Sequence, residues 1–179
     1  MATQFVHIIV DCEAIALNPN VAATSVIQMF ADPAIVKEDS NGAPDLTIQV
    51  NNQDDIRWTI YPKAPSSSVD AYTVIVDARH AWAGSSAMLK NWAAYQGQTS
   101  IPVYNPDGQL MAQDAQINIM RMSGYLPYVE AHVSLPGNQP PGYTSDDEAY
   151  SFYINIYKND QDKPVASYTW DPHVYVHQP

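Results

Sequence analysis

Asn159, Asp160 and Asp162 carry the oxygen ligands that a calcium ion binds. They lie close together in the sequence, and residues 145–148 form a second acidic segment. Calcium takes roughly six to eight oxygen ligands from carboxylates, amides and backbone carbonyls. The spacing of an EF-hand is absent, because a Lys-Pro pair interrupts the segment. The alternatives are therefore a calcium site at these three residues or a solvated acidic turn, and no other cofactor is expected.

Trp82, Trp92 and His80 form a second group of candidate ligand-binding residues. They belong to a stretch that mixes aromatic and polar side chains. An exposed tryptophan can stack on a sugar ring, and the same side chain also anchors protein interfaces. This chemistry indicates the glycan-binding surface of a lectin-like module, with or without calcium. The alternative is a cluster of packed side chains under a long loop.

Enzyme signatures are absent from the sequence. There is no Gly-x-Ser-x-Gly elbow, no phosphate-binding loop and no His-Glu-x-x-His motif. A hydrolase would need a serine or an aspartate within hydrogen-bonding reach of His80 or His132. His173 and His177 share one face of an expected strand, but at ~3.3 Å per residue they lie ~13 Å apart, too far for one zinc ion. We therefore predict no catalytic residues and no enzymatic activity.

Cys12 is the single cysteine of the chain, so an intrachain disulfide and a Cys-rich zinc module are both excluded. A blue-copper site needs a cysteine, a histidine and a methionine close together near the C-terminus. Cys12 lies at the other end of the chain, and no methionine follows Met122. We expect Cys12 to be a small buried apolar side chain.

Length, composition and charge bound the kind of protein that positions these residues. The 179 residues are 46% hydrophobic, which suits one folded domain over residues 1–179. The 8 Lys and Arg against 19 Asp and Glu give a net charge of −11, so nucleic acids and anionic membranes are not expected partners. No apolar stretch is long enough for a membrane span, and the first residues lack the character of a secretory signal. We expect a cytoplasmic protein.

Short apolar segments between frequent prolines predict an all-β fold. Ile56, Trp58 and Ile60 alternate with more polar residues, and residues 150–158 alternate in the same way. Side chains on a strand project to opposite faces in turn, so each segment has one core face. Further candidate strands are residues 5–11, 25–30, 46–50, 72–78, 101–104, 116–120, 128–134, 165–170 and 174–177. About ten half-buried strands indicate an antiparallel β-sandwich of jelly-roll or immunoglobulin-like type.

Helix is expected only as short insertions. Residues 12–17 can form one or two turns before an Asn-Pro pair ends them. Residues 85–95 carry Met88, Leu89 and Trp92 at a spacing close to that of a helix, which predicts a short helix or an irregular insertion there.

Three segments resemble the AidA/PixA inclusion-body protein family. Residues 10–15 read Val-Asp-Cys-Glu-Ala-Ile, residues 54–58 read Asp-Asp-Ile-Arg-Trp, and residues 150–154 read Tyr-Ser-Phe-Tyr-Ile. The order of the three segments and the length of the chain fit the family. Two features depart from its pattern: Cys12 stands where a threonine is usual, and Gln-Asp-Asp replaces the Gly-Asp pair before the Ile-Arg-Trp strand.

The resemblance implies a non-enzymatic bacterial cytoplasmic protein under quorum-sensing or growth-phase control, which forms inclusions in some relatives and has a possible role in host interaction. It carries over no catalytic residues. Strand faces rich in tyrosine and a low lysine content favour contacts between copies. The net charge of −11 opposes such contacts at low salt, so we expect a small closed homo-oligomer, most simply a dimer, that tightens with salt or at lower pH.

Overall fold

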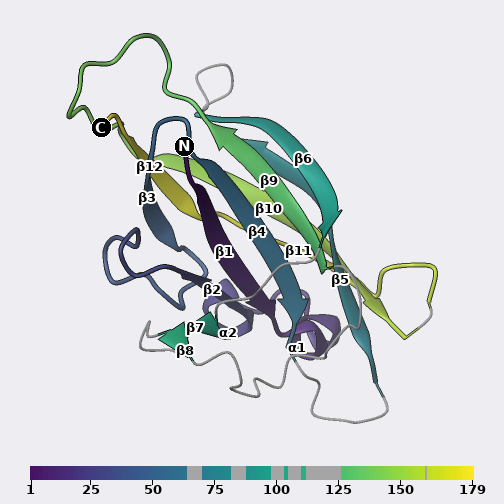
Figure 1. Ribbon diagram of the computed structural model, residues 1–179. Coiled ribbons are helices and arrows are strands. Elements are labelled where there is room, and N and C mark those ends of the chain that lie inside the picture. The colour runs from purple at the N-terminus through teal and green to yellow at the C-terminus, as the bar shows by residue number, and fades with distance from the viewer. Residues whose placement is uncertain (64–69, 82–87, 98–102, 105–109, 112–125, 160) are drawn as a thin grey trace.

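The computed structural model describes residues 1–63, 70–81, 88–97, 103–104, 110–111, 126–159 and 161–179, and their secondary structure is mostly strand (Figure 1). The strands are β1 (Thr3–Val10), β2 (Ile27–Ala31), β3 (Thr47–Asn51), β4 (Asp55–Pro62), β5 (Tyr72–Ala81), β6 (Leu89–Gly97), β7 (Val103–Tyr104), β8 (Leu110–Met111), β9 (Leu126–Val133), β10 (Glu148–Lys158), β11 (Ala166–Trp170) and β12 (His173–His177). The helices are α1 (Cys12–Leu17) and α2 (Ala23–Val26). The prediction of an all-β chain with short helical insertions is confirmed for these residues.

The strands form two main sheets. The first sheet has the order β2-β1-β4-β9-β6, and the second has the order β11-β10-β12-β3, with β5 paired to β10. A small separate sheet joins β7 and β8. Both helices lie at the end of the sheets opposite the two chain termini (Figure 1). Within the described ranges, no helix is long and apolar enough to cross a membrane.

The prediction that all strands pair antiparallel is wrong at two places. β1 and β4 are parallel, as are β12 and β3, so both main sheets are mixed. The alternation of apolar residues reports which face of a strand is buried and carries no information about the direction of the neighbouring strand. The C-terminal half of β4 is buried on both faces, as is common where parallel strands pair. A jelly-roll or immunoglobulin-like connectivity stays a prediction.

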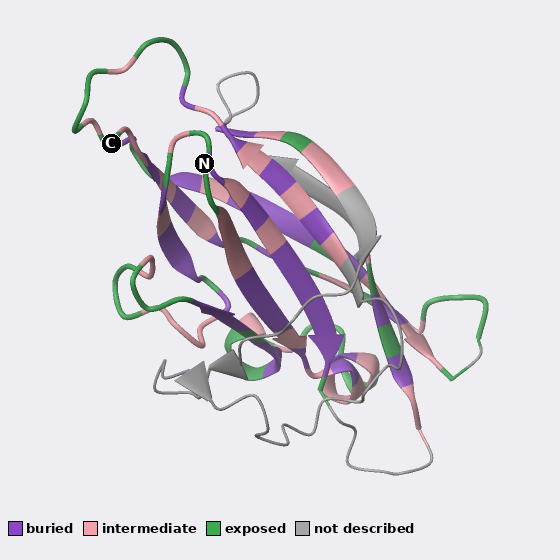
Figure 2. Cartoon of the chain, viewed as in Figure 1, coloured by how far each residue is buried: buried purple, intermediate pink, exposed green. Residues whose placement is uncertain are grey.

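A cluster of aromatic rings between the two main sheets makes the architecture sandwich-like. Trp58 of β4 is fully buried, and its ring centroid lies 5.5 Å from that of Tyr150 and 5.6 Å from that of Phe152, both on β10. The Trp58 indole N–H donates to the Tyr150 hydroxyl at 3.1 Å. Buried and more exposed residues alternate along β10, with Phe152, Ile154 and Ile156 facing inward as the sequence predicted (Figure 2).

Residues 89–95 are strand in β6, so the prediction of a short helix is wrong for them. The register with β9 shifts between Lys90 and Ala93, and Asn91 has a left-handed φ of 52°. An extra residue in a β-bulge changes the faces to which later side chains point. Leu89 and Trp92, three residues apart, therefore both pack into the core, a spacing that imitates a helix.

Cys12 is 1% exposed at the start of α1, which confirms the prediction of a buried apolar residue. Burial, with a further contribution from the Asp11 carboxylate, raises the pKa of the Cys12 thiol to about 12. Asp11 caps α1 by accepting a hydrogen bond from the Ala14 N–H at 3.0 Å.

Candidate functional site

The three segments that carry the family resemblance do structural work. Asp54 is 1% exposed and accepts hydrogen bonds from the Ala2 N–H at 2.6 Å and from the Gln4 side chain at 3.2 Å. Asp11 caps α1 and also pairs with Lys63 at 2.8 Å, while Trp58 lies in the core. Asp54 therefore holds the N-terminal end of the chain, Asp11 holds a helix, and Trp58 packs in the interior.

Of the three residues predicted to bind a ligand, Trp82, Trp92 and His80, the structure describes the side chain of Trp92 alone. The Trp92 ring stacks on Trp58 with a centroid separation of 4.9 Å, so protein already occupies one of its faces. This packing matches the alternative of a cluster of buried side chains. Trp82 lies outside the described residues. His80 lies on β5 opposite Ser151, and its side chain is outside the described part of the structure.

The structure describes two of the three predicted calcium ligands, Asn159 and Asp162. The Asn159 side-chain oxygen accepts the Ala71 N–H at 2.9 Å and so clamps the turn, where Asn159 has a φ of 53°. Asp162 is exposed, and Asp160 lies outside the described residues. Among the residues that the structure describes, no three His, Cys, Asp or Glu side chains are placed to share a metal ion.

Three residues of the second acidic segment, residues 145–148, make contacts that hold the fold together. Ser145 accepts the Val176 N–H at 2.8 Å, and Asp147 pairs with His173 at 2.6 Å. Glu148 turns inward, is 4% exposed and accepts the Met88 N–H at 2.6 Å, which links the two main sheets. Burial raises the pKa of Glu148 above its usual value.

His132, one of the two histidines named in the hydrolase interpretation, contacts an aspartate. His132 Nδ1 lies 2.9 Å from Asp55 Oδ1 across β4 and β9, and the Arg57–Glu130 pair is the next along the same face. Within the described residues, no serine hydrogen-bonds to His132. Asp55 thus meets the hydrogen-bonding condition, and neither it nor His132 lines the pocket described below. With Arg57 and Glu130 they form a ladder of cross-strand polar pairs, which stabilises a sheet surface.

A buried polar cluster on the first main sheet was not predicted. His7 is 5% exposed and lies beside Thr59, which is 1% exposed, while the Tyr61 hydroxyl is 3.5 Å from His7 Nδ1. His7 Nε2 and Thr59 Oγ1 have no hydrogen-bond partner in the described structure. The one sequence signal is a histidine inside the apolar segment Thr3–Val10.

Acid is expected to destabilise the fold through His7. Burial lowers its pKa from 6.5 to about 4, so the unfolded chain binds a proton more readily than the folded chain below pH 6.5. The stabilisation is thus present above pH 6.5 and is lost as the pH falls toward 4. Urea denaturation at pH 7.5 and 4.5 should show a loss about 2–3 kcal/mol larger for the natural chain than for His7→Phe. Equal losses in both proteins would contradict this assignment.

An uncharged face lies on the outward side of β5, β10 and β11 in the second main sheet. On β10 the outward residues alternate with the buried ones, and register pairs Asn155 with both Ser167 of β11 and Ile75 of β5. The uncharged face comprises Thr73, Ile75, Tyr153, Asn155, Tyr157, Ser167 and Thr169. Ile75 is 50% exposed and Tyr153 is 43% exposed. No member of this set carries a charge, although the whole chain has a net charge of −11.

Ionic contacts mark the two ends of the uncharged face. Asp171 accepts a hydrogen bond from Ser151 at 2.6 Å at one end, and Lys158 pairs with Asp70 at 3.0 Å at the other. Leu17 is 82% exposed. It lies two residues before Pro19, the first residue of the segment 19–21 that borders β11. Ile75 and Tyr153 therefore lie between these two ends on a face whose described side chains are uncharged, and exposed apolar side chains in such a setting are typical of interaction sites.

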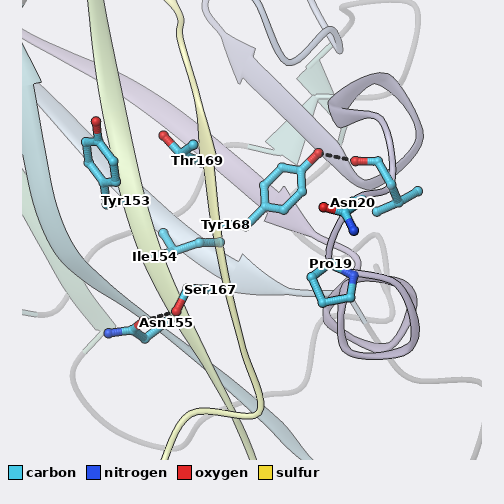
Figure 3. Close-up of a pocket in the computed structure, with 9 residues that line it drawn as sticks. Pro19, Asn20, Tyr153, Ile154, Asn155, Ser167, Tyr168 and Thr169 are labelled. Atoms are coloured by element: carbon cyan, nitrogen blue, oxygen red, sulfur yellow. Dashed lines mark hydrogen bonds between the residues drawn. The ribbon is translucent and has the colours of Figure 1, made fainter.

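A pocket of about 460 Å³ lies at the border of the uncharged face, between β10, β11 and residues 19–21 (Figure 3). Its lining includes Asn20, Tyr153, Asn155, Tyr168 and Thr169. The Tyr168 hydroxyl donates to the Val21 carbonyl and so fixes the wall against β11. No residue that lines the pocket is charged. Sequence reasoning missed this site because its walls come from opposite ends of the chain.

Comparison with known proteins shows a shared fold. The crystal structure of the inclusion body protein PixA from Burkholderia cenocepacia matches 98% of this chain and 95% of its own chain, with a TM-score of 0.60 and 13% sequence identity. No protein-family model matches the chain, and no curated protein matches it. The resemblance read from the three sequence segments is therefore confirmed at the level of the fold.

Proposed function

We propose that this chain is a non-enzymatic structural protein of the inclusion-body type that associates with copies of itself through the uncharged face. The observation that carries the proposal is the exposure of Ile75 and Tyr153 on a sheet face whose described outward side chains are uncharged. The fold shared with a protein described as an inclusion body protein supports the same assignment. We further propose that residues 1–179 act as one domain in the bacterial cytoplasm, under growth-phase or quorum-sensing control.

Charge favours the uncharged face as the contact between copies. Two copies that each carry a net charge of −11 repel one another, and the repulsion is strongest where acidic side chains meet. A contact through Tyr153, Asn155 and the other described members of the uncharged face brings uncharged side chains of the two copies together. If each copy uses the same face, the contact is isologous and closes as a dimer.

Salt and acid are expected to strengthen the association. Raising the ionic strength from 0.01 to 0.15 M shortens the Debye length from ~30 Å to ~8 Å, so the repulsion between copies is screened. Acid acts in the same direction, because taking up protons lowers the net negative charge of each copy. Light scattering coupled to size-exclusion chromatography should show a mass above that of one chain at pH 5 and 0.15 M salt, and a lower mass at pH 8 and 0.01 M salt. A single-chain mass under both conditions would refute the proposal.

A further inference from the structure

We infer that the pocket beside β11 binds a neutral saccharide. Its volume of about 460 Å³ lies within the range of small-molecule sites, roughly 300–1,000 Å³. The pocket combines two tyrosine rings, two amide side chains and hydroxyl groups, with no charge among its lining residues. This inference goes beyond self-association and does not depend on it.

The hydrogen bonds around the pocket fix its walls in place. Ser167 donates to Asn155 Oδ1 at 2.6 Å, which orients the Asn155 amide so that its N–H groups remain available as donors. The Asn20 N–H donates to Asn18 Oδ1 at 3.1 Å, which holds the loop that carries the Asn20 side chain. Figure 3 shows Asn20, Asn155 and Ser167 around the pocket, with the Tyr168 hydrogen bond drawn as a dashed line. A wall that is already ordered costs little further entropy on binding.

The chemistry of the lining selects the ligand class. A pyranose has one apolar face of C–H groups, which can lie on the exposed Tyr153 ring, and hydroxyls at its edge, which can pair with Asn20, Asn155 and Thr169. A purely apolar ligand would leave the amides unpaired. An anionic ligand would find no cation in the lining and would be repelled by the acidic chain.

The test is a titration with maltotriose and cellotriose, two neutral oligosaccharides, followed by ¹H–¹⁵N NMR at a protein concentration where light scattering shows single chains. We expect saturable shifts with at least one of them, a dissociation constant on the order of 1 mM for so shallow a site, and no saturation with sialyllactose. If neither maltotriose nor cellotriose gives saturable shifts up to about 20 mM, the inference is overturned.

Variants separate this pocket from any other site. Tyr153→Ala should weaken binding at least about tenfold, whereas Tyr153→Phe, which keeps the ring, should stay within about threefold. Tyr157→Ala is the matched control, because Tyr157 lies on the same strand face and does not line the pocket. Equal weakening by the two alanine variants, or by neither, would overturn the inference. Thermal unfolding of each variant confirms that it is folded.

Tyr153 belongs to both the pocket and the uncharged face, so a bound saccharide should compete with a second copy. Failure of the two proposals is nevertheless distinguishable. Sugar binding to a chain that stays single at all salt concentrations would reject self-association only, and assembly without sugar binding would reject the saccharide site only.

Discussion

A double variant with Ile75→Glu and Tyr153→Glu is expected to remain a single chain under conditions in which the natural protein associates. Both side chains are well exposed in the isolated chain, at 50% and 43%, so the substitutions should leave the fold intact. In a symmetric contact they would place four carboxylates in a surface that excludes water. Like charges opposed in an interface cost several kcal/mol, so we expect the association constant to fall at least about 100-fold.

A second double variant controls for the added charge itself. Gln28→Glu and Asn138→Glu change exposed residues away from the uncharged face and raise the net negative charge by the same amount. This control should weaken association only slightly, and the small effect should disappear at high salt. Sedimentation equilibrium on both variants makes the comparison. Equal dissociation by the two would mean that total charge, and not the uncharged face, governs assembly.

Replacing Trp58 with alanine is expected to have the largest effect on stability. The side chain is fully buried between the sheets, and its ring lies against Trp92, Tyr150 and Phe152. Removing it leaves a cavity lined by aromatic rings, and the Tyr150 hydroxyl loses the indole N–H. We expect the free energy of unfolding to fall by roughly 3–5 kcal/mol, as is usual for a large aromatic residue in a core.

Two further variants show which part of that loss is packing. Tyr150→Phe removes the hydroxyl and keeps the ring, so it should cost about 1–3 kcal/mol for the unsatisfied indole N–H. Ile75→Ala changes an exposed residue and should stay within about 0.5 kcal/mol of the natural chain. Urea denaturation gives all three values. A loss below about 1 kcal/mol for Trp58→Ala would mean that the two sheets do not share this core.

Many strands and their inward faces could be predicted from the sequence, because every second side chain of a half-buried strand points to the core. The alternation around Trp58 and Phe152 identified both strands and their inward faces correctly. The same rule failed at β6, because the bulge at Asn91 places Leu89 and Trp92 on one face at a helical spacing. The parallel pairing of β1 with β4 could not be predicted, since strand direction depends on the path of the intervening chain.

The candidate site was less predictable than the fold. Two of the residues chosen for their chemistry make structural contacts: Trp92 packs on Trp58, and Asn159 clamps a turn. The pocket is lined by residues such as Asn20 and Tyr153, which are far apart in the sequence and belong to no binding motif. Their proximity becomes visible only in the folded chain. The uncharged face is similar, because it becomes visible only when β5, β10 and β11 are placed side by side.

Hydroxyl-radical footprinting of the natural chain, dilute at low salt and concentrated at 0.15 M salt, tests most directly whether copies meet through the uncharged face. We predict that modification of Tyr153 and Ile75 falls several-fold in the concentrated sample, while Met1, which is 89% exposed and outside the face, keeps its rate. A rise in mass with unchanged modification of Tyr153 and Ile75 would contradict it.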